Sequence, residues 1–411
     1  MRSLSPINSS LDQINSQNRI IGLAPLMKLA FNGEDLKPIG EKLIERSKQH
    51  PDDANALMDL ATILLLIGQR DIALATQIEA LQHQQIFHIP SVGEPKLRVL
   101  ALMSPGDLMA NTPIEFLLED SNIALDIMYI GVGIPAVDKI PDHDVMFVAI
   151  GESDETQFVL EELSNLTTLW PRPVINTPEH ILDLARDRAA QLLHDIPGVE
   201  VPLSVRVSRE RLSNIGDETI AIEGMLAGSA FPIIVRPVGS HAGKGLKRIN
   251  SADEVQDYLN AVPDNEFYIA PFVDYHSPDG LFRKYRIILI EGKPFVCHMA
   301  VSSHWIIHYL NAGMTESSDK RAEEERFMLN FENNFVPRHK EALTEISKRI
   351  GLDYIGIDCS ETQDGKLLVF EVDSDMIVHD MDPSDVFPYK HPQMEKLFFA
   401  FRNMLTKAAS H

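Results

Sequence analysis

The chain has 411 residues, which is long enough for two or three domains with apolar cores of their own. Its 60 acidic residues outnumber its 37 Lys and Arg and give a net charge of −23, so binding to nucleic acid or to an anionic membrane surface is not expected. No apolar run reaches the ~18 residues of a membrane span, and the N-terminus lacks the apolar core of a signal peptide. We expect a cytoplasmic protein in which Cys297 and Cys359 are buried thiols.

The N-terminal part of the chain is polar first and then helical. Residues 1–19 lack apolar periodicity, so we expect a flexible arm followed by a helical domain over residues 20–92. Within it, residues 51–84 resemble a tetratricopeptide repeat of ~34 residues, with Gly68 at the turn, and residues 25–50 resemble a degenerate preceding unit. One or two repeats are too few to be stable alone. We therefore expect these helices to pack on the rest of the chain or on a second copy of it, as in a homodimer, in preference to forming a peptide-binding groove for a protein partner.

Residues 93–178 alternate between apolar runs and helical patterns. The runs lack polar alternation, which is typical of parallel strands covered on both faces by helices; they are Leu97–Met103, Ala124–Ile130, Val145–Ile150 and Pro173–Ile175. Glycines follow these runs, at the strand ends where ligands bind in such sheets. The Gly-x-Gly-x-x-Gly pattern is absent, so no dinucleotide site is predicted.

A glycine-rich loop lies within residues 232–249. The β-branched run Ile233–Val235 leads into Arg236, and a loop with Gly239, Ser240, Gly243 and Lys244 follows. Glycines let backbone N–H groups approach phosphate oxygens, and a lysine adds a point charge. The spacing is not that of a Walker loop, and by itself the pattern is more typical of a plain hairpin.

A second hairpin, over residues 355–375, carries acidic side chains. Gln363-Asp364-Gly365 predicts its turn, Asp358 ends the first apolar run, and Glu371 and Asp373 are two residues apart on the second strand, hence on one face. Three carboxylates on one face repel each other, and hard oxygen ligands suit Mg²⁺ or Mn²⁺. The alternative is an exposed face with solvated acids.

The glycine loop followed by the carboxylate hairpin resembles the ATP-grasp superfamily, of the glutathione synthetase and RimK-like carboxylate–amine ligase type. The resemblance extends over residues 95–405. It implies an α/β class fold: a pre-ATP-grasp α/β domain over 93–178, then an ATP-grasp domain over 179–411 whose α+β lid subdomain covers residues 200–275.

The resemblance also implies roles for residues of the nucleotide site. Arg188 and Arg236 stand where the family has lysines that reach nucleotide phosphate. Arg286 would neutralise the transferred phosphoryl group, with Lys284 two residues earlier where an acid is common. Phe272 and Val273 would offer backbone groups to adenine after Pro271, which has no N–H.

Residues 302–316 and 374–392 are loop-like segments with polar side chains. His304 and His308 are spaced as a metal pair on a helix, but we favour a substrate-facing loop because no third ligand follows. The resemblance implies that Asn311 contacts phosphate or an acyl substrate. The acids of residues 374–392 suggest either an acidic rim for an amine acceptor or a polar surface loop.

Taken together, the resemblance implies an ATP- and Mg²⁺-dependent ligase. It would activate a small-molecule carboxylate as an acyl phosphate and join it to an amine or a thiol. Asp358, Glu371 and Asp373 would hold the metal, and Arg236, Lys244 and Arg286 would offset charge during transfer. Two alternatives stay open: a kinase that acts on a hydroxyl, and a non-catalytic nucleotide-binding scaffold that uses its helices to bind a partner.

Overall fold

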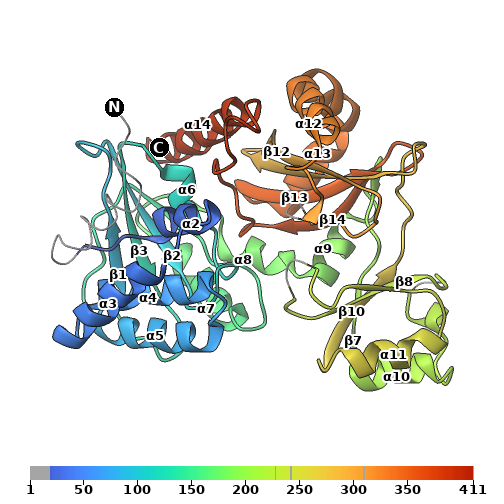
Figure 1. Ribbon diagram of the computed structural model, residues 1–411, viewed down its shortest axis with the longest axis horizontal. Helices are drawn as coiled ribbons and strands as arrows, with labels where there is room; N and C mark the ends of the chain where they lie inside the picture. The colour runs from blue at the N-terminus through green and yellow to red at the C-terminus, as the bar shows by residue number, and fades with distance from the viewer. Residues whose placement is uncertain (1–18, 227, 241–242, 309–310, 411) are drawn as a thin grey trace. The chain divides into compact units, whose positions relative to one another are not determined.

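The computed structural model describes residues 19–226, 228–240, 243–308 and 311–410. The chain forms two compact units, which are described separately below (Figure 1). Unit 1 comprises Met1–Leu182, Ser374–Asp382 and Met394–His411, and unit 2 comprises Asp183–Asp373 and Pro383–Gln393. The arm expected at residues 1–19 lies outside the described residues except for Arg19. Across the described part of the chain, no helix combines the length and the apolar character needed to cross a membrane.

Unit 1 is built on a five-stranded sheet with the order β1-β3-β2-β4-β5. The four strands predicted from apolar runs form its parallel part, which confirms that prediction. The edge strand β1 pairs with β3 in antiparallel fashion and was not predicted, because a four-residue segment carries too little periodicity. The strands are β1 Ile86–Ile89, β2 Leu97–Met103, β3 Ile123–Tyr129, β4 Val145–Val148 and β5 Val174–Ile175.

Helices of the N-terminal segment pack against this sheet (Figure 1, blue). They are α2 Leu23–Phe31, α3 Lys37–Gln49, α4 Ala54–Leu66 and α5 Arg70–His83. The predicted turn at Gly68 has a φ of +79°, which favours glycine. Leu57 and Leu81 of these helices share a core with Phe87 of β1. The helices therefore belong to the same compact unit as the α/β sheet, while their similarity to a tetratricopeptide repeat stays a prediction.

The C-terminal helix α14, Lys390–Ala408, belongs to unit 1 from Met394 onward, although the expected ATP-grasp domain included it. Arg402 donates a hydrogen bond of 3.0 Å to the carbonyl oxygen of Leu117, and the ring of Phe401 lies 5.6 Å from that of Phe147. The chain thus returns to its first unit at its end. The remaining helices of this unit are α6 Ile114–Leu118, α7 Gln157–Thr167 and α8 Pro178–Ile181.

Unit 2 contains a four-stranded antiparallel sheet, here called the lid sheet, in the range expected for a lid. Its order is β7-β10-β8-β9, with β7 Val205–Ser208, β8 Ile233–Pro237, β9 Lys247–Ile249 and β10 Glu266–Pro271. Helices α10 Arg209–Gly216 and α11 Asp253–Ala261 contribute to its apolar core. The glycine loop connects β8 to β9, and a Cβ on Gly245 would lie 2.8 Å from the ring of Pro237, so only glycine fits there.

The second sheet of unit 2, here called the hairpin sheet, has the order β12-β11-β13-β14-β6. Its strands are β6 Val199–Glu200, β11 Phe282–Ile290, β12 Lys293–Ser302, β13 Tyr354–Glu361 and β14 Leu367–Asp373. The predicted hairpin is confirmed, with Gly365 at a φ of +83° in its turn. Helix α9 Arg186–Leu193 also belongs to this unit. Residues 318–350 form two helices, α12 Ser318–Asn330 and α13 Val336–Ile350, with a π-helical turn at Phe331–Phe335 between them.

Candidate functional site

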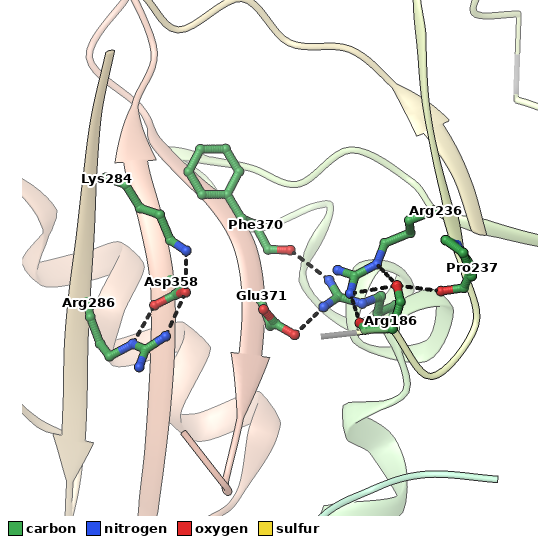
Figure 2. A network of polar contacts seen from close by, with 9 residues as sticks. Arg186, Arg236, Pro237, Lys284, Arg286, Asp358, Phe370 and Glu371 are labelled. Atoms are coloured by element: carbon green, nitrogen blue, oxygen red, sulfur yellow. Dashed lines mark hydrogen bonds and ion pairs between the residues drawn. The ribbon is translucent and has the colours of Figure 1, made fainter. Parts of the chain in front are cut away.

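A row of charged side chains crosses three strands of the hairpin sheet. Arg286 of β11 pairs with Asp358 of β13, which in turn pairs with Glu371 of β14. Residues directly opposite each other in antiparallel strands project from the same face. Lys284 precedes Arg286 by two residues and therefore shares this face. Figure 2 shows Lys284 and Arg286 both reaching Asp358, with Glu371 beside them.

Asp358 holds two cations on its two oxygens. The Nε of Arg286 donates to Oδ1 at 2.8 Å and its Nη2 donates to Oδ2 at 3.0 Å, while the Nζ of Lys284 lies 2.6 Å from Oδ2. The Asp358 side chain is 2% exposed. Burial acts to raise the pKa of Asp358, but the charges of Arg286 and Lys284 outweigh it and hold that pKa well below its usual range. Asp358 is therefore ionised at neutral pH.

Glu371 forms an ion pair with Arg186, the first residue of helix α9 (Figure 2). Burial acts to raise the pKa of Glu371, but the charges of Arg186 and Arg236 lower it below its usual value. The resemblance placed Arg188 of the same helix at the nucleotide phosphates; Arg188 is exposed in the structure, and its phosphate-binding role stays a prediction. A signal for Arg186 was present, because it lies four residues before the buried Ala190 and so shares the inner face of the helix.

Arg236, at the end of the lid strand β8, lies beside Arg186 (Figure 2). Its guanidinium donates to the carbonyl oxygen of Ser240 and, at 3.3 Å, to the Ser240 hydroxyl. Within the described ranges, no carboxylate forms an ion pair with Arg236. Burial and then the like charge of Arg186 lower the pKa of Arg236 to about 10, so it remains charged at neutral pH. The structure thus brings two guanidinium groups together with Glu371.

The glycine loop has the backbone that its composition predicted. Gly239 and Gly243 have φ values of +69° and +74°, a region that favours glycine. Ser240 fixes the loop through its hydroxyl, which donates to the carbonyl oxygen of Pro237 at 2.8 Å. Lys244 is exposed at the end of the loop. The phosphate-binding roles of Gly239, Ser240, Gly243 and Lys244 stay predictions.

The segment after β10, which was expected to bind adenine, has one of its backbone groups engaged within the protein. The N–H of Phe272 donates to the carbonyl oxygen of Pro232 at 3.1 Å, so the structure already uses a group that was expected to face adenine. The ring of Phe272 lies 5.5 Å from that of Trp305 and under the guanidinium of Arg248. The adenine-facing roles of the Phe272 carbonyl oxygen and of Val273 stay predictions.

His308 lies in the electrostatic environment of the charged row, and its substrate-facing role stays a prediction. Burial and then the charges of Lys284 and Arg286 lower the pKa of His308, so it is neutral at pH 7. Residues 303–308 are bends and coil rather than helix, which removes the basis for a helical metal pair with His304. His304 and Asn311 are exposed, and the N–H of Asn311 donates to the carbonyl oxygen of His308 at 2.9 Å.

The expected acidic rim at residues 374–392 is not a uniform surface feature. Asp375 is buried in unit 1, where a Cβ on Gly151 would lie 2.1 Å from one of its carboxylate oxygens. His379 contacts the rings of Phe31 and Phe116. These side chains pack within unit 1, and only the exposed acids of the segment, such as Asp385, fit the polar-loop alternative.

The three carboxylates predicted to hold a metal ion, Asp358, Glu371 and Asp373, are arranged differently from the expectation. In the part of the chain that the structure describes, no three His, Cys, Asp or Glu side chains are grouped so that they could hold a metal ion. Asp358 is engaged by cations, as described above. Glu371 and Asp373 share one face of β14, with Asp373 opposite Gly356. The metal-binding roles of the three carboxylates remain predictions.

Comparisons with known proteins give distant structural similarity. No protein-family model matches the sequence, and neither does any curated protein. The chain is similar to the D-alanine–D-alanine ligase of Coxiella burnetii at 11% identity and a TM-score of 0.48, covering 77% of this chain and 96% of that one. It is similar to the VanG D-Ala:D-Ser ligase of Enterococcus faecalis at 14% identity and a TM-score of 0.46, covering 76% and 99%.

A third similar structure is the ATP-grasp ligase PsnB, in complex with a phosphomimetic variant of a minimal precursor, Mg and ADP. Its identity is 13% and its TM-score 0.41, covering 75% of this chain and all of that one. Because these scores all lie below 0.5, we base the function proposed next on the residues of the chain itself.

Proposed function

We propose that unit 2 binds ATP and transfers its γ-phosphoryl group to a carboxylate substrate, as the first step of an ATP-dependent carboxylate–amine or carboxylate–thiol ligase. One observation carries this proposal. Arg236, which leads into the glycine loop of the lid sheet, belongs to the same charged network as Glu371 of the hairpin sheet. The two motifs whose combination resembles the ATP-grasp superfamily therefore meet at one site within unit 2.

The charge balance of this site favours a polyanionic ligand. Four cations, Arg186, Arg236, Lys284 and Arg286, lie around the two carboxylates of Asp358 and Glu371, and the charge of Asp373 also acts on Arg236, so the cations are in excess by one. The side-by-side placement of Arg186 and Arg236 is unfavourable in the absence of an anion, because like charges repel strongly where water is partly excluded. A triphosphate supplies the missing negative charge, and guanidinium groups match the geometry of its oxygens.

The proposed chemistry needs no nucleophile from the protein. A substrate carboxylate oxygen bonds to the γ-phosphorus while the bond from that phosphorus to the β–γ bridging oxygen breaks, which releases ADP. An amine or thiol then attacks the acyl carbon, the bond to the phosphate oxygen breaks, and phosphate leaves as the nucleophile loses its proton to water. Arg236 and Arg186 would bind the phosphates, and Arg286, held in place by Asp358, would stabilise charge on the transferred group.

A divalent ion fits part of this site. Mg²⁺ is usually held by one or two carboxylates together with substrate phosphates. Glu371 and Asp373, on one face of β14, provide such a pair of oxygen ligands. When bound, Mg²⁺ or Mn²⁺ would neutralise charge on the phosphoryl group. Asp358 does not fit this role in the structure, because both of its oxygens contact Arg286 or Lys284.

Nucleotide binding tests the proposal directly. Trp305 lies against Phe272 in unit 2, so its fluorescence reports on this region in a Trp170→Phe background. We expect Mg-ATP to bind and, at ~100 times its dissociation constant, to add ~2.7 kcal/mol of stability. Arg236→Met should weaken binding by at least about tenfold because a charge-assisted contact is lost. Arg206→Met is the matched control, since Arg206 lies on the same lid sheet and pairs with Glu266.

Product analysis tests the reaction class. A screen of amino acids and small carboxylates with candidate amines and thiols should give ADP and phosphate together with an amide or thioester. Glu371→Gln serves as the inactive control. Release of ADP with a stably phosphorylated alcohol would indicate a kinase instead, and failure of the wild type to bind ATP would overturn the proposal.

A further inference from the structure

Lys284 is a lysine held inside the carboxylate cluster, at the position where a metal ion was expected. Its Nζ lies 2.6 Å from Oδ2 of Asp358, and its side chain is 20% exposed while that of Asp358 is 2% exposed. Asp358 thus anchors the ammonium from the protein side, and part of the lysine side chain remains accessible to solvent. An ammonium has three donors, so one contact with Asp358 leaves two for other acceptors.

The neighbours of Lys284 indicate what those acceptors are. Arg286 already neutralises Asp358 through two hydrogen bonds, so the charge of Lys284 is in excess at this carboxylate. On the other side of the row, Arg186 neutralises Glu371. His308, whose pKa is lowered by burial and then by the charge of Lys284, carries no negative charge in either protonation state, so it does not serve as the anion. The excess charge is therefore directed toward an anionic ligand.

We propose that Lys284 is a built-in cation that takes the place of one divalent ion at Asp358 and contacts a phosphate of the bound nucleotide. This inference rests on the proposed function and adds to it a statement about metal dependence. A divalent ion between two carboxylates and a phosphate brings opposite charges together, and an ammonium tethered by Asp358 does the same without having to be recruited from solution. Nucleotide binding should therefore persist when divalent ions are removed.

The test is a titration of the full chain with ATP, once in EDTA and once in excess Mg²⁺. Binding is measured by calorimetry and by Trp305 fluorescence. We expect wild type in EDTA to bind ATP within about tenfold of its affinity in Mg²⁺. Lys284→Gln should weaken binding in EDTA by more than about tenfold and weaken binding in Mg²⁺ less. Lys284→Arg, which keeps the charge, should restore most of the binding in EDTA.

Lys366→Gln is the matched control. Lys366 directly precedes β14 and forms an exposed ion pair of 3.2 Å with Glu200. Loss of the Lys366 charge should therefore change neither titration. Unfolding curves of each variant show whether it remains folded, and the wild-type titration in EDTA does not depend on any variant.

Each outcome separates the two proposals. Wild type that binds ATP only with Mg²⁺ would overturn the role of Lys284 and leave the ligase proposal standing. Binding in EDTA that Lys284→Gln does not weaken would also overturn it, because the cation responsible would be another residue. Wild type that binds ATP under neither condition would overturn the proposed function itself.

Discussion

Two buried aspartates, Asp59 in unit 1 and Asp358 in unit 2, are compensated in different ways. Asp59 accepts hydrogen bonds from the backbone N–H groups of Ile21 at 2.8 Å and Gly22 at 3.0 Å, just before helix α2. Asp358 instead contacts the charged groups of Lys284 and Arg286. Both side chains are almost fully removed from solvent, so the difference between them lies in their partners rather than in their burial.

The two pKa values shift in opposite directions. Burial raises the pKa of Asp59 to about 7, although the N–H groups of Ile21 and Gly22 act to lower it. The pKa of Asp358 lies below its usual range because two cations outweigh burial. Backbone dipoles thus compensate a buried carboxylate only in part, whereas full charges overcompensate it. Asp59 anchors the start of a helix, and Asp358 holds two cations in place.

The largest expected effect comes from removing the charge of Asp358. Asp358→Asn leaves Lys284 and Arg286 without their shared carboxylate, and breaking a buried ion pair on one side costs ~3–5 kcal/mol. Urea unfolding of the Trp170→Phe variant, followed through Trp305, reports the loss for unit 2 because the chain has 2 tryptophans. Asp364→Asn, in the exposed hairpin turn, should leave the midpoint unchanged. If Asp358→Asn lowers the stability no more than Asp364→Asn does, then Lys284 and Arg286 are neutralised by other groups.

The second effect is a pH dependence of opposite sign in the two units. The folded pKa of Asp59 lies above its unfolded value near 3.8, so its folded state binds the extra proton between pH ~4 and ~7. Unit 1 should lose stability as pH rises through this window, by at most ~1.4 kcal/mol per pH unit for this group. Asp358 has the opposite effect on unit 2. Its contribution to the free energy of unfolding is present above pH ~4 and is lost as the pH falls below that value.

The measurement uses Trp170, which reports unit 1 in a Trp305→Phe background. Urea midpoints at a series of pH values should fall from pH 4 to pH 7 in this variant, and Asp59→Asn should flatten the profile. Glu115 lies in the same region and burial raises its pKa too, so Glu115→Gln in the same background separates the two groups. A profile that Asp59→Asn leaves unchanged would refute the assignment.

How far the sequence predicts the site is shown by the register of the hairpin. The turn at residues 362–366 pairs Cys359 with Val369, and continuing that register would place Asp358 opposite Phe370. A β-bulge between Asp358 and Cys359 shifts the pairing by one residue and brings Glu371 opposite Asp358. The sequence predicted both carboxylates and their hairpin, but a bulge depends on non-local packing and could not be predicted from it.

Partners from distant parts of the chain were also beyond prediction. Arg286 and Asp358 were each singled out, but their pairing requires β11 and β13 to be neighbours, which periodicity does not reveal. The same holds for the return of Met394–His411 to unit 1. Local patterns, such as the strand Leu97–Met103 and the positive-φ glycines of the loop, were predictable because neighbouring residues determine them.

A third buried acid, Glu324 in unit 2, sharpens the comparison because it combines both kinds of partner. It accepts from the Tyr389 hydroxyl at 2.7 Å and from the N–H of Met299 at 3.0 Å, and Lys390 lies 3.5 Å away. Tyr389→Phe should cost about 1.5–3 kcal/mol, since one hydrogen bond to a buried, ion-paired carboxylate is lost. Urea unfolding followed through Trp305 measures it. An unchanged free energy of unfolding would mean that Lys390 and the N–H of Met299 are enough to stabilise the buried Glu324 carboxylate.

The smallest effect is expected at an exposed ion pair of the same chemical type as Arg286–Asp358. Arg98 and Asp142 of unit 1 lie 3.4 Å apart, but their side chains are 55% and 78% exposed. Water solvates both ions whether or not they pair, so Arg98→Met should change the stability of unit 1 by no more than about 0.5 kcal/mol. Urea unfolding followed through Trp170 measures it, with Asp142→Asn as a check from the other side. A stability loss as large as that of Asp358→Asn would show that exclusion of water does not distinguish the two ion pairs. The difference between them would then have to come from their geometry.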